Sequence, residues 1–94
     1  MTTALDASAR PRPREGFVLE ELGGEIVIYH PATEAIFYCN ATAALIWKLC
    51  DGARDVAAIT QLLSEAYPQA AERMADDVNA TLWQLLSHRA LELT

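Results

Sequence analysis

Residues 29–59 constrain the fold more than any other stretch, because signals for a strand, a helix start, a buried helix face and a helix stop follow one another without a gap. Asn40 is a typical N-cap, so we expect a helix to begin at Ala41. The Asp51-Gly52 pair can supply the left-handed conformation that ends a helix. Between these signals, apolar residues recur at the spacing of one helix face: Ala43, Ile46, Trp47 and Cys50. The pattern predicts a short amphipathic helix directly after a strand.

The residues before this helix predict a three-stranded antiparallel meander. Phe17–Leu22 and Glu25–His30 are rich in Val, Ile, Phe and Tyr, and the Gly23-Gly24 pair between them suits a tight hairpin turn. Residues 31–34 form a second turn, and Ala35–Cys39 form a third, short strand. Because this strand is apolar and lacks charge, its open edge is either covered by another element or kept free to receive a strand.

Two further helices follow. Asp55 can cap a helix over Val56–Tyr67 that ends at Pro68, and a longer helix is expected from about Gln69 to Arg89. The predicted inward positions of the two helices are Val56, Ile59, Leu63, Ala66 and Tyr67, then Ala71, Met74, Ala75, Val78, Leu82, Leu85 and Leu86. Leu91–Leu93 alternate as a short terminal strand or an extended tail would.

The third helix has two margins beside its apolar stripe. Trp83 lies on one margin, where a large aromatic side chain can mark a contact surface or fold over the core edge. The opposite margin carries Asp77, Thr81, Gln84 and His88. One of the two should face the sheet edge, and the sequence leaves open which. Asp76 and Asp77 also suit the positive end of the helix dipole.

Length and charge predict one domain with a tail. The chain has 94 residues, enough for a single core, and residues 16–94 are expected to form it. Residues 1–15 contain an alternating Arg-Pro run and few large apolar side chains, so they are expected to be a flexible tail that is either merely solvated or in contact with a partner. From Gly16 onward four basic residues face eleven acidic ones, 4 − 11 = −7. Such a surface repels nucleic acid and attracts a basic peptide or enzyme patch.

No set of residues with enzymatic chemistry is evident, so the chain is not expected to be an enzyme or to hold a cofactor or metal. His30 lacks a nucleophile and an orienting carboxylate nearby in the sequence, and no glycine-rich phosphate loop occurs. Cys39 and Cys50 are interpreted as buried hydrophobes, with a redox or oligomer-linking thiol as the alternative. No apolar run reaches the roughly 18 residues of a membrane span, and no secretion signal begins the chain, so we expect a cytoplasmic protein.

The run NATAALIWKLCDG, at residues 40–52, resembles the PqqD family. The resemblance implies an α+β, winged-helix-like fold in which three strands pack on three helices, also called a RiPP recognition element. It further implies that a precursor leader peptide binds as an added strand against the third strand, beside the third helix, by β-augmentation. The partners implied are that peptide and a separate modifying enzyme, such as a radical S-adenosylmethionine maturase, a leader protease or a cyclase. A homodimer is a further option. Neither nucleic acid nor a membrane is expected as a partner.

Carried over by position, the resemblance gives a set of peptide-binding residues. Ile36 and Tyr38 share one face of the receiving strand, and Phe37 takes the other. The full set comprises Ala35, Ile36, Phe37, Tyr38 and Cys39 on the strand, with Asp77, Val78, Thr81, Leu82 and Leu85 on the helical wall.

The chain departs from the family pattern in places. Cys39 stands where relatives often carry Leu, and Asp55 stands where they carry Thr or Ser. A glycine often ends the third helix, whereas His88 and Arg89 precede Ala90 here, so this helix is expected to run further.

Two rival functions remain. A winged-helix transcription regulator is disfavoured by charge, because the 56–67 helix has no basic residue to present to DNA. An oligomerisation module would assemble without any peptide ligand.

Overall fold

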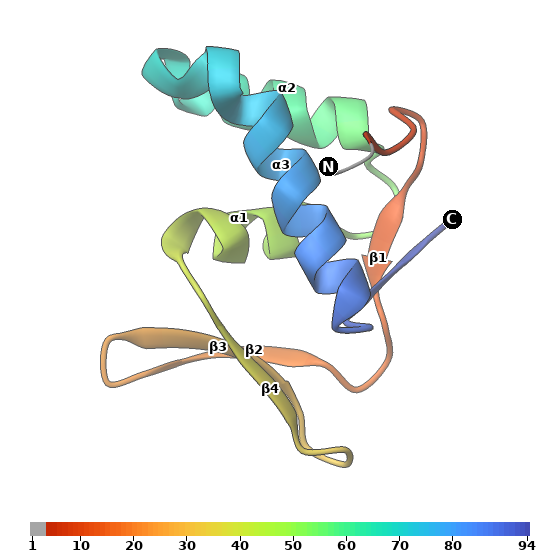
Figure 1. The fold of residues 1–94 in the computed structure, drawn as a ribbon, viewed down its shortest axis with the longest axis vertical. Helices are drawn as coiled ribbons and strands as arrows, with labels where there is room; N and C mark the ends of the chain where they lie inside the picture. Colours follow the sequence, from red (N-terminus) through yellow and green to blue (C-terminus); the bar gives the residue numbers. More distant parts are fainter. Residues whose placement is uncertain (1–3) are drawn as a thin grey trace.

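A computed structural model describes residues 4–94, and residues 1–3 of the expected tail lie outside the described part. The helices gather on one side of a small sheet, which forms the lower layer in Figure 1. In chain order the elements are β1 (Pro11–Pro13), β2 (Val18–Leu22), β3 (Glu25–His30), β4 (Ala35–Cys39), α1 (Ala41–Leu49), α2 (Val56–Ala66), a 3-10 turn (Pro68–Ala70), α3 (Ala71–Ser87) and β5 (Leu91–Leu93).

The predicted meander is confirmed. Strands β2, β3 and β4 form an antiparallel sheet in that order, with Ile28 opposite both Leu19 and Phe37. Gly23 and Gly24 have φ angles of 58° and 87°, which only glycine adopts without steric cost, so the hairpin turn forms as the sequence predicts. The α+β class, with three strands on three helices, is therefore confirmed as well.

The helix caps form at the predicted residues. Asn40 and Asp55 accept hydrogen bonds from the backbone N–H groups of Ala43 and Ala58, both at 2.8 Å. Each cap satisfies a backbone donor that has no partner inside its helix, which fixes where α1 and α2 begin.

The apolar stripes of the helices build a single core, to which Ile28 and Phe37 contribute from the sheet. The predicted stripe of α1 is buried. The predicted stripes of α2 and α3 are buried along their middle and exposed at some of their ends. Ala66 and Tyr67 are exposed at the C-terminal end of α2, which stops at Ala66. Ala71 and Ala75 are exposed in the first turns of α3. The buried positions are Val56, Ile59 and Leu63 in α2 and Met74, Val78, Leu82 and Leu85 in α3.

The expectation of a flexible tail needs correction for residues 4–15. Strand β1 pairs antiparallel with β5, Pro11 is fully buried, and Leu5 and Ala9 pack against the core. The Val56 N–H donates to the Ala9 carbonyl oxygen at 2.9 Å, and the Gly52 N–H donates to that of Pro11 at 3.0 Å. These backbone bonds to distant residues and the packing of Leu5, Ala9 and Pro11 order the segment. Leu91–Leu93 form a strand, and β1 is its partner.

The end of α3 also differs from the prediction. The helix stops at Ser87, two residues before the predicted end at Arg89. Arg89 has a φ of 59°, its N–H donates to the Leu86 carbonyl oxygen, and the Ala90 N–H donates to that of Leu85. This is the hydrogen-bond pattern of a Schellman motif, with arginine in the left-handed position that glycine usually takes. The chain then turns into β5.

The cysteines behave as small buried groups to different degrees. Cys50 is 2% exposed and its Sγ donates to the Ile46 carbonyl oxygen at 3.0 Å. Burial, with a smaller contribution from Asp51, raises the pKa of the Cys50 thiol to about 12. Cys39 is half-buried, and burial raises the pKa of its thiol too. Both thiols are therefore protonated and weakly nucleophilic near neutral pH.

Within residues 4–94 no helix combines the length and the apolar character that a bilayer span requires. The cytoplasmic location stays a prediction.

Candidate functional site

Strand β4 is an edge of the meander. In the described chain it hydrogen-bonds to β3 alone, so the backbone groups along its other side have no strand partner. Ala35 and Cys39 at its ends are half-buried, Phe37 at its centre is 8% exposed and faces the helices, and Ile36 and Tyr38 point the opposite way. An added strand would find a short, regular row of donors and acceptors here.

Helix α3 runs beside this edge, and two observations decide which of its margins faces β4. The His88 ring stacks on Phe37, with the ring centroids 4.3 Å apart and the planes inclined by 11°. A hollow of about 240 Å³ lies further along the helix, lined by Asn40, Thr42, Asp77, Ala80 and Thr81. The margin of Asp77, Thr81 and His88 therefore lies on the β4 side of α3. His88 contacts Phe37 of β4, and Asp77 and Thr81 line a hollow together with Asn40 and Thr42 at the start of α1. We call the space between β4 and this margin the groove.

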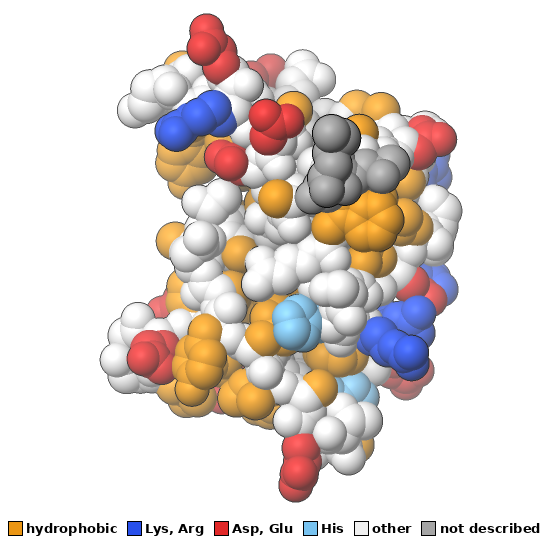
Figure 2. All heavy atoms as spheres, in the orientation of Figure 1, with side chains coloured by type: hydrophobic (Ala, Val, Ile, Leu, Met, Phe, Trp, Pro, Cys, Tyr) orange, Lys and Arg blue, Asp and Glu red, His pale blue; other side chains and the backbone are white. Residues whose placement is uncertain are grey.

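The surface view agrees with a molecule of two layers. In Figure 2 the outline is hollowed on its left side, between the helical layer above and the sheet layer below. Hydrophobic side chains, in orange, are exposed along the lower layer, and acidic side chains, in red, stand at the ends of both layers. The sheet layer thus carries exposed apolar surface next to carboxylates.

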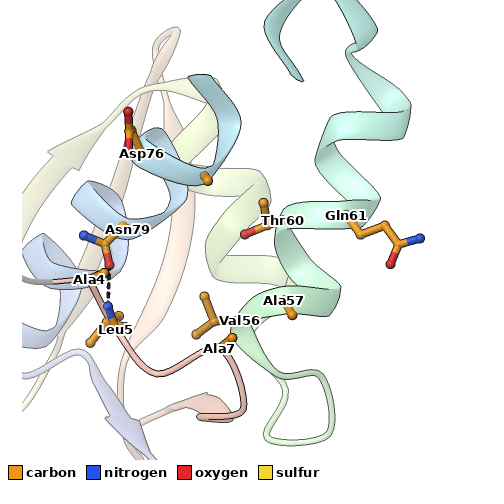
Figure 3. A pocket seen from close by; sticks show the side chains of 10 residues that line it. Ala4, Leu5, Ala7, Val56, Ala57, Thr60, Gln61, Asp76 and Asn79 are labelled. Atoms are coloured by element: carbon orange, nitrogen blue, oxygen red, sulfur yellow. Dashed lines mark hydrogen bonds between the residues drawn. The ribbon is translucent and has the colours of Figure 1, made fainter. Parts of the chain in front are cut away.

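The opposite margin of α3 is occupied by the chain's own N-terminal segment. Figure 3 shows a cavity between residues 4–7, α2 and α3, where the Leu5 N–H donates to Asn79 Oδ1 at 2.8 Å. Trp83 lies one turn beyond Asn79 and is 38% exposed. The N-terminal segment packs on this side of α3, and the cavity shares no lining residue with the hollow beside Asp77.

Three of the predicted wall residues are not available to a ligand. Val78, Leu82 and Leu85 are at most 1% exposed and belong to the core, whereas Asp77 is exposed and Thr81 half-buried. The sequence prediction therefore needs correction, because the stripe and its margin both follow the helical period but only the margin borders the groove. The buried side chains support the wall from behind.

The structure adds groove residues that the sequence prediction did not include. His88 covers Phe37, and Asn40, Thr42 and Ala80 line the hollow near Asp77. His88 follows Asp77 and Thr81 at helical spacing, so the margin pattern could have identified it. Asp77 is the seventh residue of α3, whose first turn contains only Glu72 as an acidic residue. Asp77 thus lies beyond the reach of the helix dipole, contrary to the predicted structural role.

A second hollow lies at the Ala35 end of β4. Its lining includes Arg14, Phe17, His30, His88 and Arg89, together with Glu15 and Glu92. The Phe17 and His30 rings meet edge to face with their centroids 5.1 Å apart. The Arg-Pro run thus contributes to the groove's surroundings through Arg14, which a tail detached from the domain would not do.

The chemical groups at the groove are an open strand edge, aromatic rings, a carboxylate and a thiol. Cys39 at the end of β4 is a thiol whose pKa burial raises, so it is a poor nucleophile at neutral pH. No cluster of three or more His, Cys, Asp or Glu side chains that could hold a metal occurs among the described residues. What the groove offers is an open strand edge, an aromatic platform of Phe37 and His88, and one carboxylate.

Residues 25–91 match the family described as Coenzyme PQQ synthesis protein D (PqqD). The chain belongs to the PqqD family. This stretch contains β3, β4 and all three helices, and the resemblance noted in the sequence is confirmed.

Individual relatives extend this result. Two proteins called PqqA binding protein, from Klebsiella pneumoniae (strain 342) and from Klebsiella pneumoniae, are each 50% identical over 44 residues. The match covers 47% of this chain and 46% of each relative, so the chain spans about half the length of these proteins.

A solved structure shares the fold. It is described as "TbiB1 in Complex with the TbiA(beta) Leader Peptide" and superposes with a TM-score of 0.70 at 21% identity. The superposition covers 86% of this chain and 94% of the other. The winged-helix-like arrangement predicted from the resemblance is thus found in a second protein of low sequence identity.

Proposed function

We propose that this chain binds the leader segment of a ribosomally synthesised precursor peptide and presents it to a separate modifying enzyme, without catalysing a reaction itself. The observation that carries the proposal is the open edge of β4 beside the exposed margin of α3. The names of the relatives support it, because two are called PqqA binding protein and the structural neighbour was solved with a leader peptide.

In this proposal the leader binds by β-augmentation. Its backbone pairs with the free side of β4, which gives affinity that tolerates sequence changes, and alternate side chains enter the groove, which gives specificity. The inward side chains meet the Phe37–His88 platform, and one of them reaches the hollow beside Asp77 and Thr81. A Lys or Arg at that leader position fits, because it would approach a carboxylate.

The peptide-binding residues predicted from the sequence divide into two groups in this proposal. Ala35, Phe37, Cys39, Asp77 and Thr81 border the groove, and the backbone of Ile36 and Tyr38 takes part in strand pairing. Val78, Leu82 and Leu85 contribute only through the fold. His88 joins the set as the cover of Phe37.

The enzyme partner is a maturase, protease or cyclase that acts on the bound precursor. Homodimerisation through β4 is the competing hypothesis, because two copies could pair their open edges. Leader affinity measured over a range of protein concentrations distinguishes the two hypotheses. If two copies paired through β4, leader binding would be weaker at high protein concentration. The DNA-binding alternative finds no support in the charges of α2, which carries no Lys or Arg.

Amide hydrogen exchange with and without leader tests the proposal. Among Ile36, Phe37 and Tyr38, we expect the amides whose N–H groups point away from β3 to gain protection, because a new strand removes these backbone groups from water. The amides of β2, at the other edge of the sheet, serve as the internal control. Protection confined to α2, or shared equally by both edges, would contradict the assignment.

A further inference from the structure

The face of the sheet that points away from the helices carries a group of apolar side chains. Four large side chains on it are exposed: Val18 by 40%, Leu22 by 54%, Ile36 by 56% and Tyr38 by 64%. The strand register places Val18, Tyr29 and Ile36 in one row and Glu20, Val27 and Tyr38 in the next. We call this surface the outer face, made of Val18, Leu22, Val27, Tyr29, Ile36 and Tyr38.

Val27 shows that the outer face is continuous. It is 2% exposed yet lies outside the core cluster that Ile28 and Phe37 join with the helices. Strand alternation directs it away from Ile28, so its cover comes from neighbours on the outer face, Tyr38 and Glu20 across the strands. Apolar side chains gathered in this way on a small protein mark an interaction surface more often than isolated ones do.

The charges around the outer face restrict what can cover it. No Lys or Arg occurs between Arg14 and Lys48, whereas that stretch contains five glutamates: Glu15, Glu20, Glu21, Glu25 and Glu34. Glu20 and Glu25 lie on the outer face itself, and Glu20 accepts a hydrogen bond from the Tyr29 hydroxyl at 2.8 Å. Two copies packed face to face would oppose these carboxylates, and an anionic membrane or nucleic acid would be repelled. The complementary surface is that of a protein with an apolar centre and a Lys/Arg rim.

The outer face is also continuous with the groove. Ile36 and Tyr38 belong to β4, the strand that receives the leader under the proposed function. A strand added to β4 extends the sheet by one strand, and its outward side chains extend the outer face. A protein seated there touches the domain and the bound peptide together.

We infer that the modifying enzyme docks on the outer face and that the bound leader forms part of the docking surface. The inference rests on the proposed function for the identity of the partner. It assigns two tasks to the two faces of the same sheet: the groove side holds the leader, and the outer face holds the enzyme. Enzyme affinity is consequently higher for the complex with leader than for the domain alone.

Titration calorimetry with the precursor leader, and with the modifying enzyme encoded beside the precursor gene, tests this inference. The variant is Val18→Ser combined with Leu22→Ser on β2, two strands away from the groove. The matched control is Leu62→Ser, which removes a leucine of 42% exposure from α2. We expect the double variant to lose at least about ten-fold in enzyme affinity and to bind leader as the parent does, because apolar anchors at the centre of an interface dominate its affinity. Leu62→Ser should change neither affinity.

A second variant probes the charge argument. Glu25→Lys should weaken the enzyme complex and reduce the dependence of its affinity on salt. The change replaces the attraction between Glu25 and the Lys/Arg rim of the enzyme with repulsion. Unchanged enzyme affinity in the double variant, with leader binding intact, would overturn the docking site. Equal enzyme affinity with and without leader would overturn the shared surface. If the parent bound the enzyme through this face but did not bind leader, the proposed function would fail and the docking site would survive.

Discussion

Asp77 and Leu85 are both on α3, but we predict different roles for them, Asp77 in leader recognition and Leu85 in folding. Leu85 is 1% exposed inside the core, and Asp77 is exposed at the hollow of the groove. Leu85→Ala removes buried apolar atoms and leaves a cavity, so it should lower the free energy of unfolding by about 2 to 5 kcal/mol. For a domain of this size that corresponds to a fall in Tm of about 10 °C or more.

Asp77→Ala should have the reverse profile. Its side chain is in solvent and lies beyond the first turn of α3, so the free energy of unfolding should change by less than about 0.5 kcal/mol. A leader with Lys or Arg at the hollow should lose about 1 kcal/mol of binding free energy, near the upper end for an exposed ion pair. The loss should shrink as salt is added.

Paired scanning and titration calorimetry on the two variants checks both expectations. Leader affinity equal to that of the parent in Asp77→Ala, measured at low salt, would refute the role of the carboxylate. Leader selectivity would then come from the Phe37–His88 platform. A stable Leu85→Ala protein that fails to bind leader would refute the assignment of Leu85 to the core alone.

Three further changes test the fold. Trp47→Ala should lower the free energy of unfolding by about 3 to 5 kcal/mol in a urea titration, because Trp47 is 7% exposed and packs in the core. A loss below about 1 kcal/mol would mean that Trp47 is not a core residue. Lys48→Ala is the control, because Lys48 is exposed. Arg89→Gly should stabilise the protein by about 1 kcal/mol by relieving the left-handed residue at the end of α3, whereas Arg89→Ala should not. The Cys50 thiol has a folded pKa of about 12 against a reference of 9.0, so it stabilises the fold fully below pH 9 and this contribution is lost as pH rises towards 12. Unfolding free energies of Cys50→Ala should therefore fall less over this range than those of the parent, and identical slopes would contradict the burial of the thiol.

The parts of the fold that are predictable from the sequence depend on local chemistry. The Gly23-Gly24 turn, the Asn40 and Asp55 caps and the apolar stripe of α1 each use neighbouring residues, so the strand and helix starts they predict are found. Strand β1 is not predictable in this way, because its partner β5 lies at the other end of the chain and its residues are Pro and Arg. No periodicity indicates such a pairing, since its hydrogen bonds come from the backbone.

The candidate site is predictable only in outline. Strand β4 follows from its sequence, but the margin of α3 on its side does not, because both margins flank the stripe equally. The contact of His88 with Phe37 and the packing of Leu5 beside Asn79 decide that question in three dimensions. Val78, Leu82 and Leu85 are buried, whereas Asp77 is exposed and Thr81 half-buried. Carrying site residues over from the family by their position in the sequence cannot show this difference in burial.

We propose that β4 receives the leader as an added strand. Intermolecular nuclear Overhauser effects between isotope-labelled protein and unlabelled leader test it most directly. We expect cross-strand contacts that alternate along residues 35–39 and consecutive leader residues, together with contacts from leader side chains to Phe37, Thr81 and His88. Contacts that cluster instead on α2, or on the cavity beside Leu5 and Asn79, would contradict it.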